Sequence, residues 1–124
     1  MRNQKLDTIF ADAKWRVAEH WAGCLEAGLP DHSAAAHAAV DEYFQAYFEQ
    51  LRALPEPADK AAIMKVLKTL FANLDGVMTE YGGGLLETDE RELLCPPIIE
   101  AAEIAGLLLS EFEYGDPTLE FREF

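Results

Sequence analysis

Acidic residues are the side chains of this sequence whose types and spacing point most clearly to chemistry. Five of them recur in the last third of the chain at spacings that one helix would bring to a single face: Asp89, Glu92, Glu100, Glu103 and Glu111. Counted at about 100° per residue from the apolar residue Leu94, they lie roughly 160° to 260° around the axis. No lysine or arginine stands at the i,i+4 offsets that would neutralise them. The row predicts either a surface that attracts a basic partner or an ordinary solvated helix face.

The overall charge has the same bias. The net charge is −13, and residues 75–124 contribute −11 of it, with thirteen acids against only Arg91 and Arg122. A surface of one sign repels phosphate backbones and anionic membranes and speeds association with basic proteins. We therefore expect a basic protein partner and neither nucleic-acid nor membrane binding. No signal peptide and no run of about twenty apolar residues is present, so we expect a cytoplasmic protein.

The three histidines offer no recognisable metal motif. His32 and His37 are five apart and would point about 140° from each other on a helix, and neither HxxxH nor ExxH occurs in the chain. His37 and Asp41 have the spacing of one hydrogen-bonded surface pair, and His20 fits a half-buried packing position. We predict no metal and no cofactor.

The two cysteines and the glycine run are also interpreted as structural. Cys24 and Cys95 do not form a CxxC pair, and we expect both to be reduced and buried in the core, although a disulfide is not excluded by the sequence. Gly82-Gly83-Gly84 lacks the GxxxxGK[ST] spacing of a phosphate loop and predicts a flexible connection. Neighbouring carboxylates such as Glu87 and Asp89 could in principle serve acid–base catalysis, but a row on a convex helix face supplies no cleft. A non-catalytic protein is therefore favoured over an enzyme.

Helices must position these residues, because apolar residues recur every three to four positions through most of the chain. The pattern predicts an all-α, single-domain antiparallel bundle over residues 1–124. Gly28 and Pro30, Pro55-Glu56-Pro57 and the triple glycine separate the segments. The expected helices are residues 6–27, a second that begins at Asp31 or Ser33 and ends at residue 54, then residues 58–81 and 88–114.

The fourth helical segment has two open features. Pro96-Pro97 must kink it or split it, yet the apolar phase from Leu94 continues through the prolines as far as Phe112. The tail from Thr118 to Phe124 forms either a short turn or an extended segment. In both cases the expected contacts with the core come from three apolar residues: Leu119, Phe121 and Phe124.

Trp15 gives the first helix a second apolar face. It lies about 160° from the core residue Val17, in company with three small apolar residues: Ala11, Ala18 and Ala22. Either the tail or another layer covers this face, or it is an interface for a partner or for a second copy of the chain.

Together these features predict a non-catalytic, acidic protein-binding module. Its composition is similar to that of many bacterial immunity and inhibitor proteins, which suggests an inhibitor that blocks a basic, toxin-like or nuclease-like enzyme. The acidic row would bind the partner, with Trp15 or the loop from Gly82 to Glu87 as an apolar anchor. One alternative is a small helical enzyme or ligand-binding regulator with a pocket lined by four aromatic residues: Trp21, Tyr43, Phe44 and Tyr47. A third possibility is a homodimeric adaptor joined through Trp15.

Overall fold

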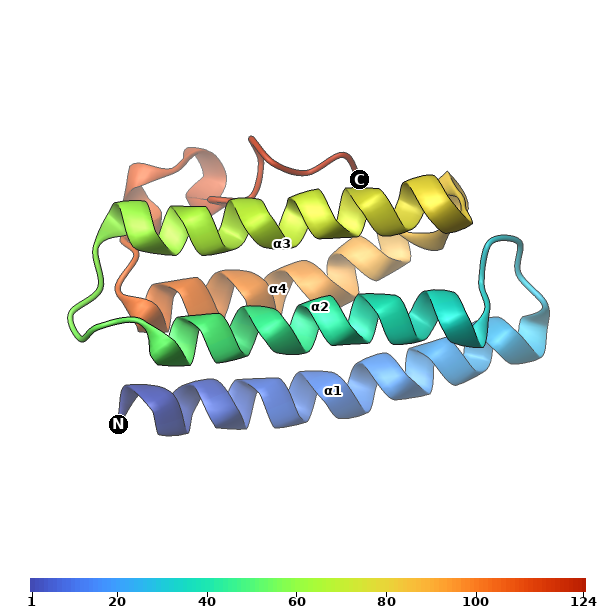
Figure 1. Cartoon of the computed structure of the whole chain (residues 1–124), viewed down its shortest axis with the longest axis horizontal. Coiled ribbons are helices and arrows are strands. Elements are labelled where there is room, and N and C mark those ends of the chain that lie inside the picture. The colour runs from blue at the N-terminus through green and yellow to red at the C-terminus, as the bar shows by residue number, and fades with distance from the viewer.

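The computed structural model describes all 124 residues and contains four long helices and no strand. They are α1 (Arg2–Ala27), α2 (Ala34–Ala53), α3 (Lys60–Tyr81) and α4 (Thr88–Ala105). Successive helices run in opposite directions, so the chain forms the expected up-and-down antiparallel bundle (Figure 1). The structure also contains three short 3-10 turns. One lies between α3 and α4, η1 (Gly83–Leu85), and two follow α4, η2 (Leu109–Glu111) and η3 (Glu113–Gly115).

Local signals fix most of the helix ends. Gly28 ends α1 in the left-handed conformation with φ 66°, which only glycine adopts without steric cost. Ser33 begins α2, because its hydroxyl accepts a hydrogen bond from the Ala36 amide at 3.1 Å. The third helix starts at Lys60, two residues later than expected, with Asp59 as its N-cap residue. These ends place the connections between antiparallel neighbours where the sequence predicts them.

Arg2 joins the start of α1 to the end of α2. Its guanidinium donates hydrogen bonds to three carbonyl oxygens around the C-terminus of α2: Leu54 at 2.7 Å, Pro55 at 3.0 Å and Arg52 at 3.2 Å. The last carbonyls of a helix have no partner inside it and carry partial negative charge. Arg2 therefore satisfies these acceptors and is itself buried.

The core contains one cluster of 27 buried apolar residues from all four helices and their connections. The predicted stripes face inward, and three of the four aromatic residues that we considered as a pocket are themselves core residues: Trp21, Phe44 and Tyr47. The Tyr47 hydroxyl donates to the Ile98 carbonyl oxygen at 2.7 Å, which satisfies its polar atom. These three aromatic residues are therefore part of the hydrophobic core.

The fourth helix is a single helix across Pro96 and Pro97, but it ends at Ala105, nine residues before the expected end at residue 114. Gly106 terminates it with φ 129°. The apolar phase beyond this point is misleading, because Leu108 is 64% exposed and Phe112 lies between two 3-10 turns. Leu94 and Ile98 are buried in the core on either side of the prolines, and this packing holds the helix together there. At Gly106 the positive φ takes the backbone out of the helical conformation, so the helix ends.

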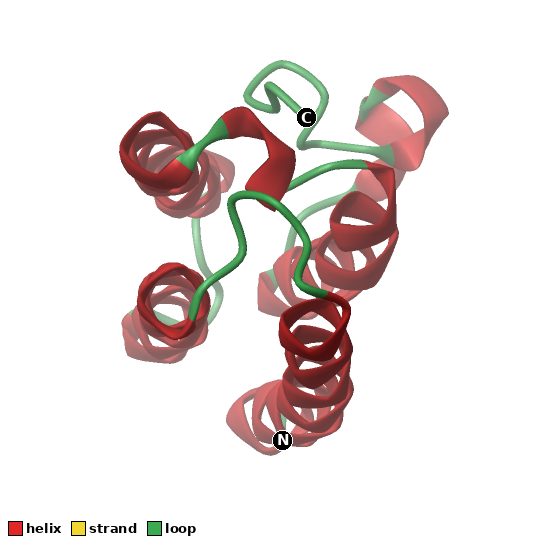
Figure 2. Ribbon diagram, turned by 90° about the vertical axis from the view of Figure 1, so that its right-hand side faces the viewer, coloured by secondary structure: helices red, strands yellow, loops and turns green.

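The C-terminal tail lies along one side of the helical bundle (Figure 2), beside α3 in the view of Figure 1. It is a turn rather than a strand: Asp116 Oδ1 accepts from the Thr118 amide at 2.9 Å, and Arg122 pairs with Asp116 at 3.0 Å. Phe121 and Phe124 pack against the core as expected, whereas Leu119 is exposed. The tail closes the side of the bundle where α3 and α4 are separated.

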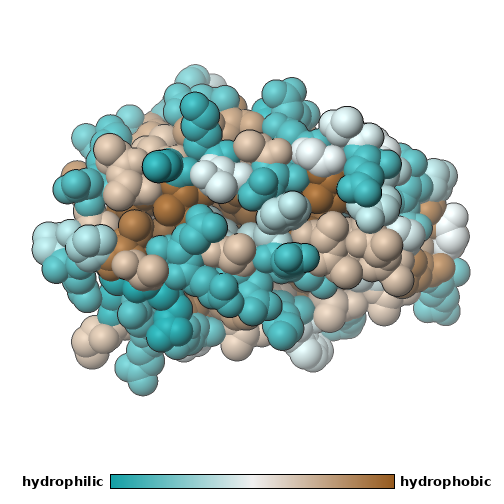
Figure 3. All heavy atoms as spheres, viewed as in Figure 1, coloured by the Kyte–Doolittle hydropathy of each residue, from teal (hydrophilic) through white to brown (hydrophobic).

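The surface shown in Figure 3 is mixed, with hydrophilic side chains interspersed with smaller apolar areas. None of the helices has a stretch that is apolar and long enough to span a bilayer.

Candidate functional site

Four of the five predicted acidic residues form an exposed row on α4: Asp89, Glu92, Glu100 and Glu103. None of these four carboxylates has a lysine, arginine or histidine nitrogen within ion-pair distance. We call these four residues the acidic face of α4. Because they face solvent and stay unpaired, their charges remain available to an external partner.

Glu111 does not belong to the acidic face. It lies in η2, beyond the end of α4 at Gly106, and its Oε1 atom is 3.6 Å from Lys60 Nζ. The early end of α4 removes it from the helix, and the lysine neutralises its charge. Its assignment to the row was therefore wrong.

Glu87 stands at the start of α4 rather than in the row. It is the N-cap residue, and its side chain and that of Glu90 form a reciprocal capping box; the Glu87 amide donates to Glu90 Oε1 at 2.9 Å. Glu87 is exposed and adds a fifth carboxylate near the acidic face.

Trp15 is 68% exposed, so neither the tail nor another layer covers it. The small residues predicted to share its side of α1 are exposed as well: Ala11, Ala18 and Ala22. We call these four residues the Trp15 face. A large aromatic side chain held in water by a rigid helix is a typical anchor for a protein contact.

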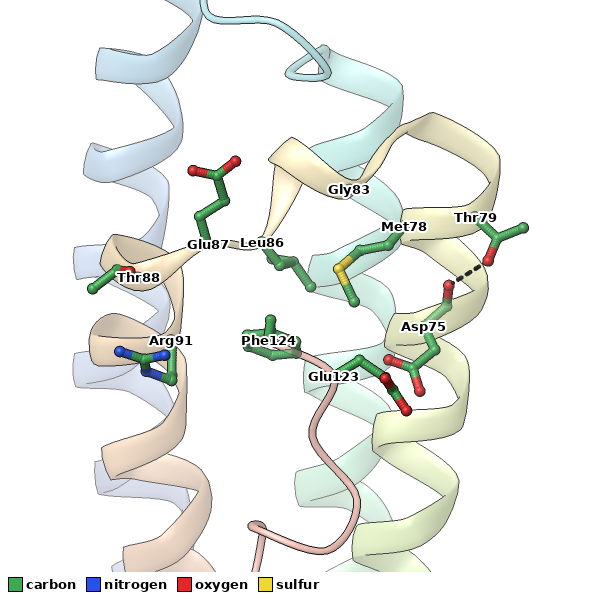
Figure 4. Close-up of a pocket in the computed structure, with 10 residues that line it drawn as sticks. All are labelled: Asp75, Met78, Thr79, Gly83, Leu86, Glu87, Thr88, Arg91, Glu123 and Phe124. Carbon is green, nitrogen blue, oxygen red and sulfur yellow. Dashed lines mark hydrogen bonds between the residues drawn. The ribbon is translucent and has the colours of Figure 1, made fainter.

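A solvent-open cleft of about 810 Å³ lies between α3, the start of α4 and the C-terminus (Figure 4). Met78, Leu86 and Phe124 supply its apolar lining. Asp75 and Glu123 lie together on the α3 side, and Arg91 lies on the α4 side. Burial, and then the nearby Glu123 charge, raise the pKa of Asp75, whose Oδ1 atom is buried without a hydrogen-bond partner. The cleft is therefore suited to a cationic group rather than to a phosphate.

A second cluster of chemically active residues lies between α1 and α4. His20 Nε2 is 2.6 Å from Glu90 Oε2 and 3.5 Å from Cys24 Sγ. Glu90 is only 5% exposed and Cys24 only 4%. The donor atoms of these three residues all lie within 4.8 Å of one another. His20 and Cys24 were expected to be packing residues, and Glu90 was not among the predicted site residues.

The other two histidines pack beside this cluster around Trp21. The His37 ring stacks on the Trp21 indole, and His37 Nε2 is 2.8 Å from His32 Nδ1. Trp21 Nε1 donates to Asp41 Oδ1 at 2.8 Å, so the expected pair between His37 and Asp41 is wrong. Desolvation, followed by the neighbouring His32 and His20 charges, lowers the pKa of His37 to about 4. At neutral pH His37 is therefore an uncharged imidazole.

The geometry of the second cluster does not fit a nucleophilic triad. In such a triad the nucleophile contacts one ring nitrogen of histidine and the orienting acid contacts the other. Here Cys24 and Glu90 both approach Nε2 of His20. Burial and the charges of Glu90 and Asp89 also raise the pKa of Cys24, whereas a catalytic thiol needs a lowered pKa. The three donors converge on one point instead of forming a relay.

No protein-family model matches the sequence, and no curated protein or solved structure matches it either.

One sequence signal for the second cluster was present and missed. His20 and Cys24 are four residues apart, which places them on one side of a helix. Glu90 could not have been added from local spacing, because it is 70 positions from His20 and is brought close only by packing of α4 on α1. Both cysteines are free and buried, as expected.

Proposed function

We propose that this protein is a non-catalytic binding module that docks on a basic protein through the acidic face of α4. The observation that carries the proposal is the set of four exposed carboxylates that no side chain of the molecule neutralises. Charges of this kind steer a basic partner and weaken in effect as salt is added.

Within the acidic face only Asp89, in the first turn of α4, has a favourable interaction with the helix N-terminus. Asp89 and Glu92 are three apart on α4, as are Glu100 and Glu103, and like charges at this spacing cost about 0.2 to 0.5 kcal/mol per pair. No ion pair within the molecule offsets the repulsion at Glu92, Glu100 and Glu103, which supports a role in recognition.

Most of the charges beside the acidic face are also negative, with Arg91 as the exception. Glu87 lies at the rim of the cleft in Figure 4, which also contains Asp75 and Glu123. A lysine or arginine of a partner bound along α4 could place its alkyl stem on Phe124 and its charge beside these carboxylates. We propose further that the partner is an enzyme whose active surface binds polyanions. This chain inhibits the enzyme by covering that surface.

Charge reversal on α4 tests the proposal against an equal reversal elsewhere. The test variant carries Glu92→Lys, Glu100→Lys and Glu103→Lys. The control carries Glu19→Lys, Glu26→Lys and Glu42→Lys, which change three exposed acids of α1 and α2 that form no ion pair. Both variants have the same net charge.

The immobilised full chain is used to capture partners from the native host at low and high salt, and the association rate of a captured partner is then measured. We expect the α4 variant to slow association at low salt by roughly tenfold or more and the control variant to change it much less. Equal slowing by both variants would show that only net charge matters. Unchanged capture by the α4 variant contradicts the proposal.

A second candidate function is self-association through the Trp15 face. The observation that favours it is the 68% exposure of Trp15 among exposed small residues. This face and the acidic face of α4 lie on different helices, so the two candidate functions can be tested with separate variants.

A further inference from the structure

The cluster of His20, Cys24 and Glu90 combines three different donor types at one point. Imidazole nitrogen, thiolate sulfur and carboxylate oxygen are the ligands that Zn²⁺ takes in proteins. His20 and Cys24 project from one side of α1, and Glu90 comes from the first turn of α4. Two rigid helices therefore hold the three donors, rather than a mobile loop.

The distances are compatible with one shared ion. Tetrahedral ligands at ordinary zinc bond lengths stand roughly 3.3 to 3.6 Å apart. Cys24 Sγ and His20 Nε2 are 3.5 Å apart. His20 Nε2 and Glu90 Oε2 are 2.6 Å apart, which is the length of a hydrogen bond. For both atoms to bind one ion, their separation must increase by less than about 1 Å.

Glu90 is held in place by a partner outside the cluster. Its Oε1 atom accepts the Glu87 amide in the capping box, which leaves Oε2 directed at His20. Such outer hydrogen bonds orient metal ligands and fix which oxygen binds. The capping box that begins α4 therefore also positions a donor atom.

Two further observations indicate a ligand at this end of the bundle. A solvent-open cleft of about 450 Å³ is lined by Glu90 together with His32 and Asp89, so one of the three donor residues borders solvent. His37, packed on Trp21 beside His20, has a buried Nδ1 atom without a hydrogen-bond partner. A buried polar atom without a partner is uncommon in native proteins.

We propose that His20, Cys24 and Glu90 form a Zn²⁺ site that joins α1 to the start of α4. Three protein ligands leave one position of a tetrahedral ion for water or for another nearby donor. Binding breaks the S–H bond of Cys24 and releases its proton to solvent, and His20 coordinates through Nε2 with its remaining proton on Nδ1. No electron transfer is involved.

Cobalt is the probe for the test, because a thiolate bound to Co²⁺ gives a charge-transfer absorption in the near ultraviolet. The full chain is first treated with a chelator and kept reduced. We expect the band to saturate at one Co²⁺ per chain, to disappear on addition of Zn²⁺, and to strengthen as pH rises because the thiol must lose its proton.

The chain supplies a matched control, since Cys95 is the other buried free cysteine. Cys24→Ser should abolish the thiolate band, and Cys95→Ser should retain it. His20→Gln and Glu90→Gln should each weaken Zn²⁺ binding by at least roughly 10- to 100-fold, the loss that even outer partners of a metal site cause. Glu90→Gln keeps an acceptor for the Glu87 amide, so it tests the ligand without removing the cap.

Alkylation of the wild-type chain makes the test independent of whether the variants fold. Zn²⁺ should slow modification of Cys24 and leave that of Cys95 unchanged, as measured by mass spectrometry. Absence of a thiolate band, a band that survives Cys24→Ser, or equal modification of Cys24 with and without Zn²⁺ would each overturn the proposal. Binding lost with His32→Gln but retained with His20→Gln would assign the ion to the other histidines instead and also overturn it.

Discussion

The imidazole of His37 lies parallel to the indole of Trp21, with ring centroids 4.0 Å apart and an angle of 9° between the planes. His32 Nδ1 lies 2.8 Å from His37 Nε2, and in this hydrogen bond one ring must donate and the other accept. Two protonated rings would present two donors to each other. The pair therefore holds its geometry only while at least one ring is neutral, and the buried His37 is that ring.

This pair predicts a loss of stability in mild acid. The pKa of His37 is lowered from 6.5 to about 4 in the folded chain. Between these pH values His37 binds a proton in the unfolded chain and stays neutral in the folded chain. The free energy of unfolding should fall as pH decreases from about 6.5 to about 4, by up to roughly 3 kcal/mol. Urea unfolding in the presence of a chelator, repeated across this pH range, measures the change.

The matched variant is His37→Phe, which retains a ring on Trp21 but cannot titrate. Burial raises the pKa of Asp41 and Asp75, so these groups make unfolding more costly at low pH and oppose the histidine. Subtracting the variant's pH profile from that of the wild type removes their contribution. Equal profiles would show that His37 is not the cause.

Asp75→Asn should stabilise the protein at neutral pH. The Asp75 carboxylate has a buried oxygen without a partner and lies near Glu123, so its charge is unfavourable. Removing the charge should raise the free energy of unfolding by about 0.5 to 1 kcal/mol, the scale of a partly screened charge interaction. The gain should shrink as pH falls, because protonated Asp75 no longer carries the charge.

The control for Asp75→Asn is Glu80→Gln, because Glu80 lies on the same helix but is exposed to solvent. A double variant with Glu123→Gln should gain less than the sum of the two single variants, because the same repulsion is removed only once. A loss of stability in Asp75→Asn at pH 7 would argue against this account of the cleft.

Arg2→Ala should be among the more destabilising changes outside the apolar core. It leaves the carbonyl oxygens of Arg52, Leu54 and Pro55 without their buried donor. Hydrogen bonds from a charged group contribute about 1.5 to 3 kcal/mol, and we expect a loss of about 2 kcal/mol in thermal or urea unfolding. Arg2→Lys should be intermediate, because lysine keeps the charge but not the planar set of donors.

Arg16→Ala supplies the comparison for Arg2. Arg16 pairs with Asp12 at 2.7 Å one turn away, but both side chains are at least half exposed. Its removal should cost at most about 0.5 kcal/mol, because exposed helix pairs contribute little. Similar losses for Arg2→Ala and Arg16→Ala would mean that burial of Arg2 does not matter to stability.

Periodicity predicted the bundle well because each helix carries its own stripe and its own stop signals. The stripe of α1 through Leu6, Val17 and Trp21 is buried, and Gly28 ends that helix as expected. The same method failed after Gly106, where Leu108 and Phe112 continued the apolar phase by coincidence. A backbone conformation that favours glycine ended the helix, and a count of apolar residues does not contain that information.

The candidate sites divide in the same way. The acidic face could be predicted, because its four residues belong to one helix and lie opposite the buried apolar side of that helix. Lys60 reaches Glu111 and Glu90 reaches His20 only through the packing of distant segments. A single sequence gives no direct signal for such contacts, so it overestimated the acidic row and missed the three-residue cluster.

Trp15→Ser tests whether the exposed side of α1 serves association rather than folding. Trp15 is 68% exposed, so the free energy of unfolding should change by less than about 0.5 kcal/mol. If the Trp15 face joins two copies of the chain, sedimentation should show a concentration-dependent dimer in the wild type and a monomer in the variant. Trp21→Phe, in the buried ring stack, should do the reverse: it should lower stability while the oligomeric state is unchanged. A wild-type chain that stays monomeric at high concentration would contradict the dimer and leave Trp15 as an anchor for a different protein, which the same variant tests in partner capture.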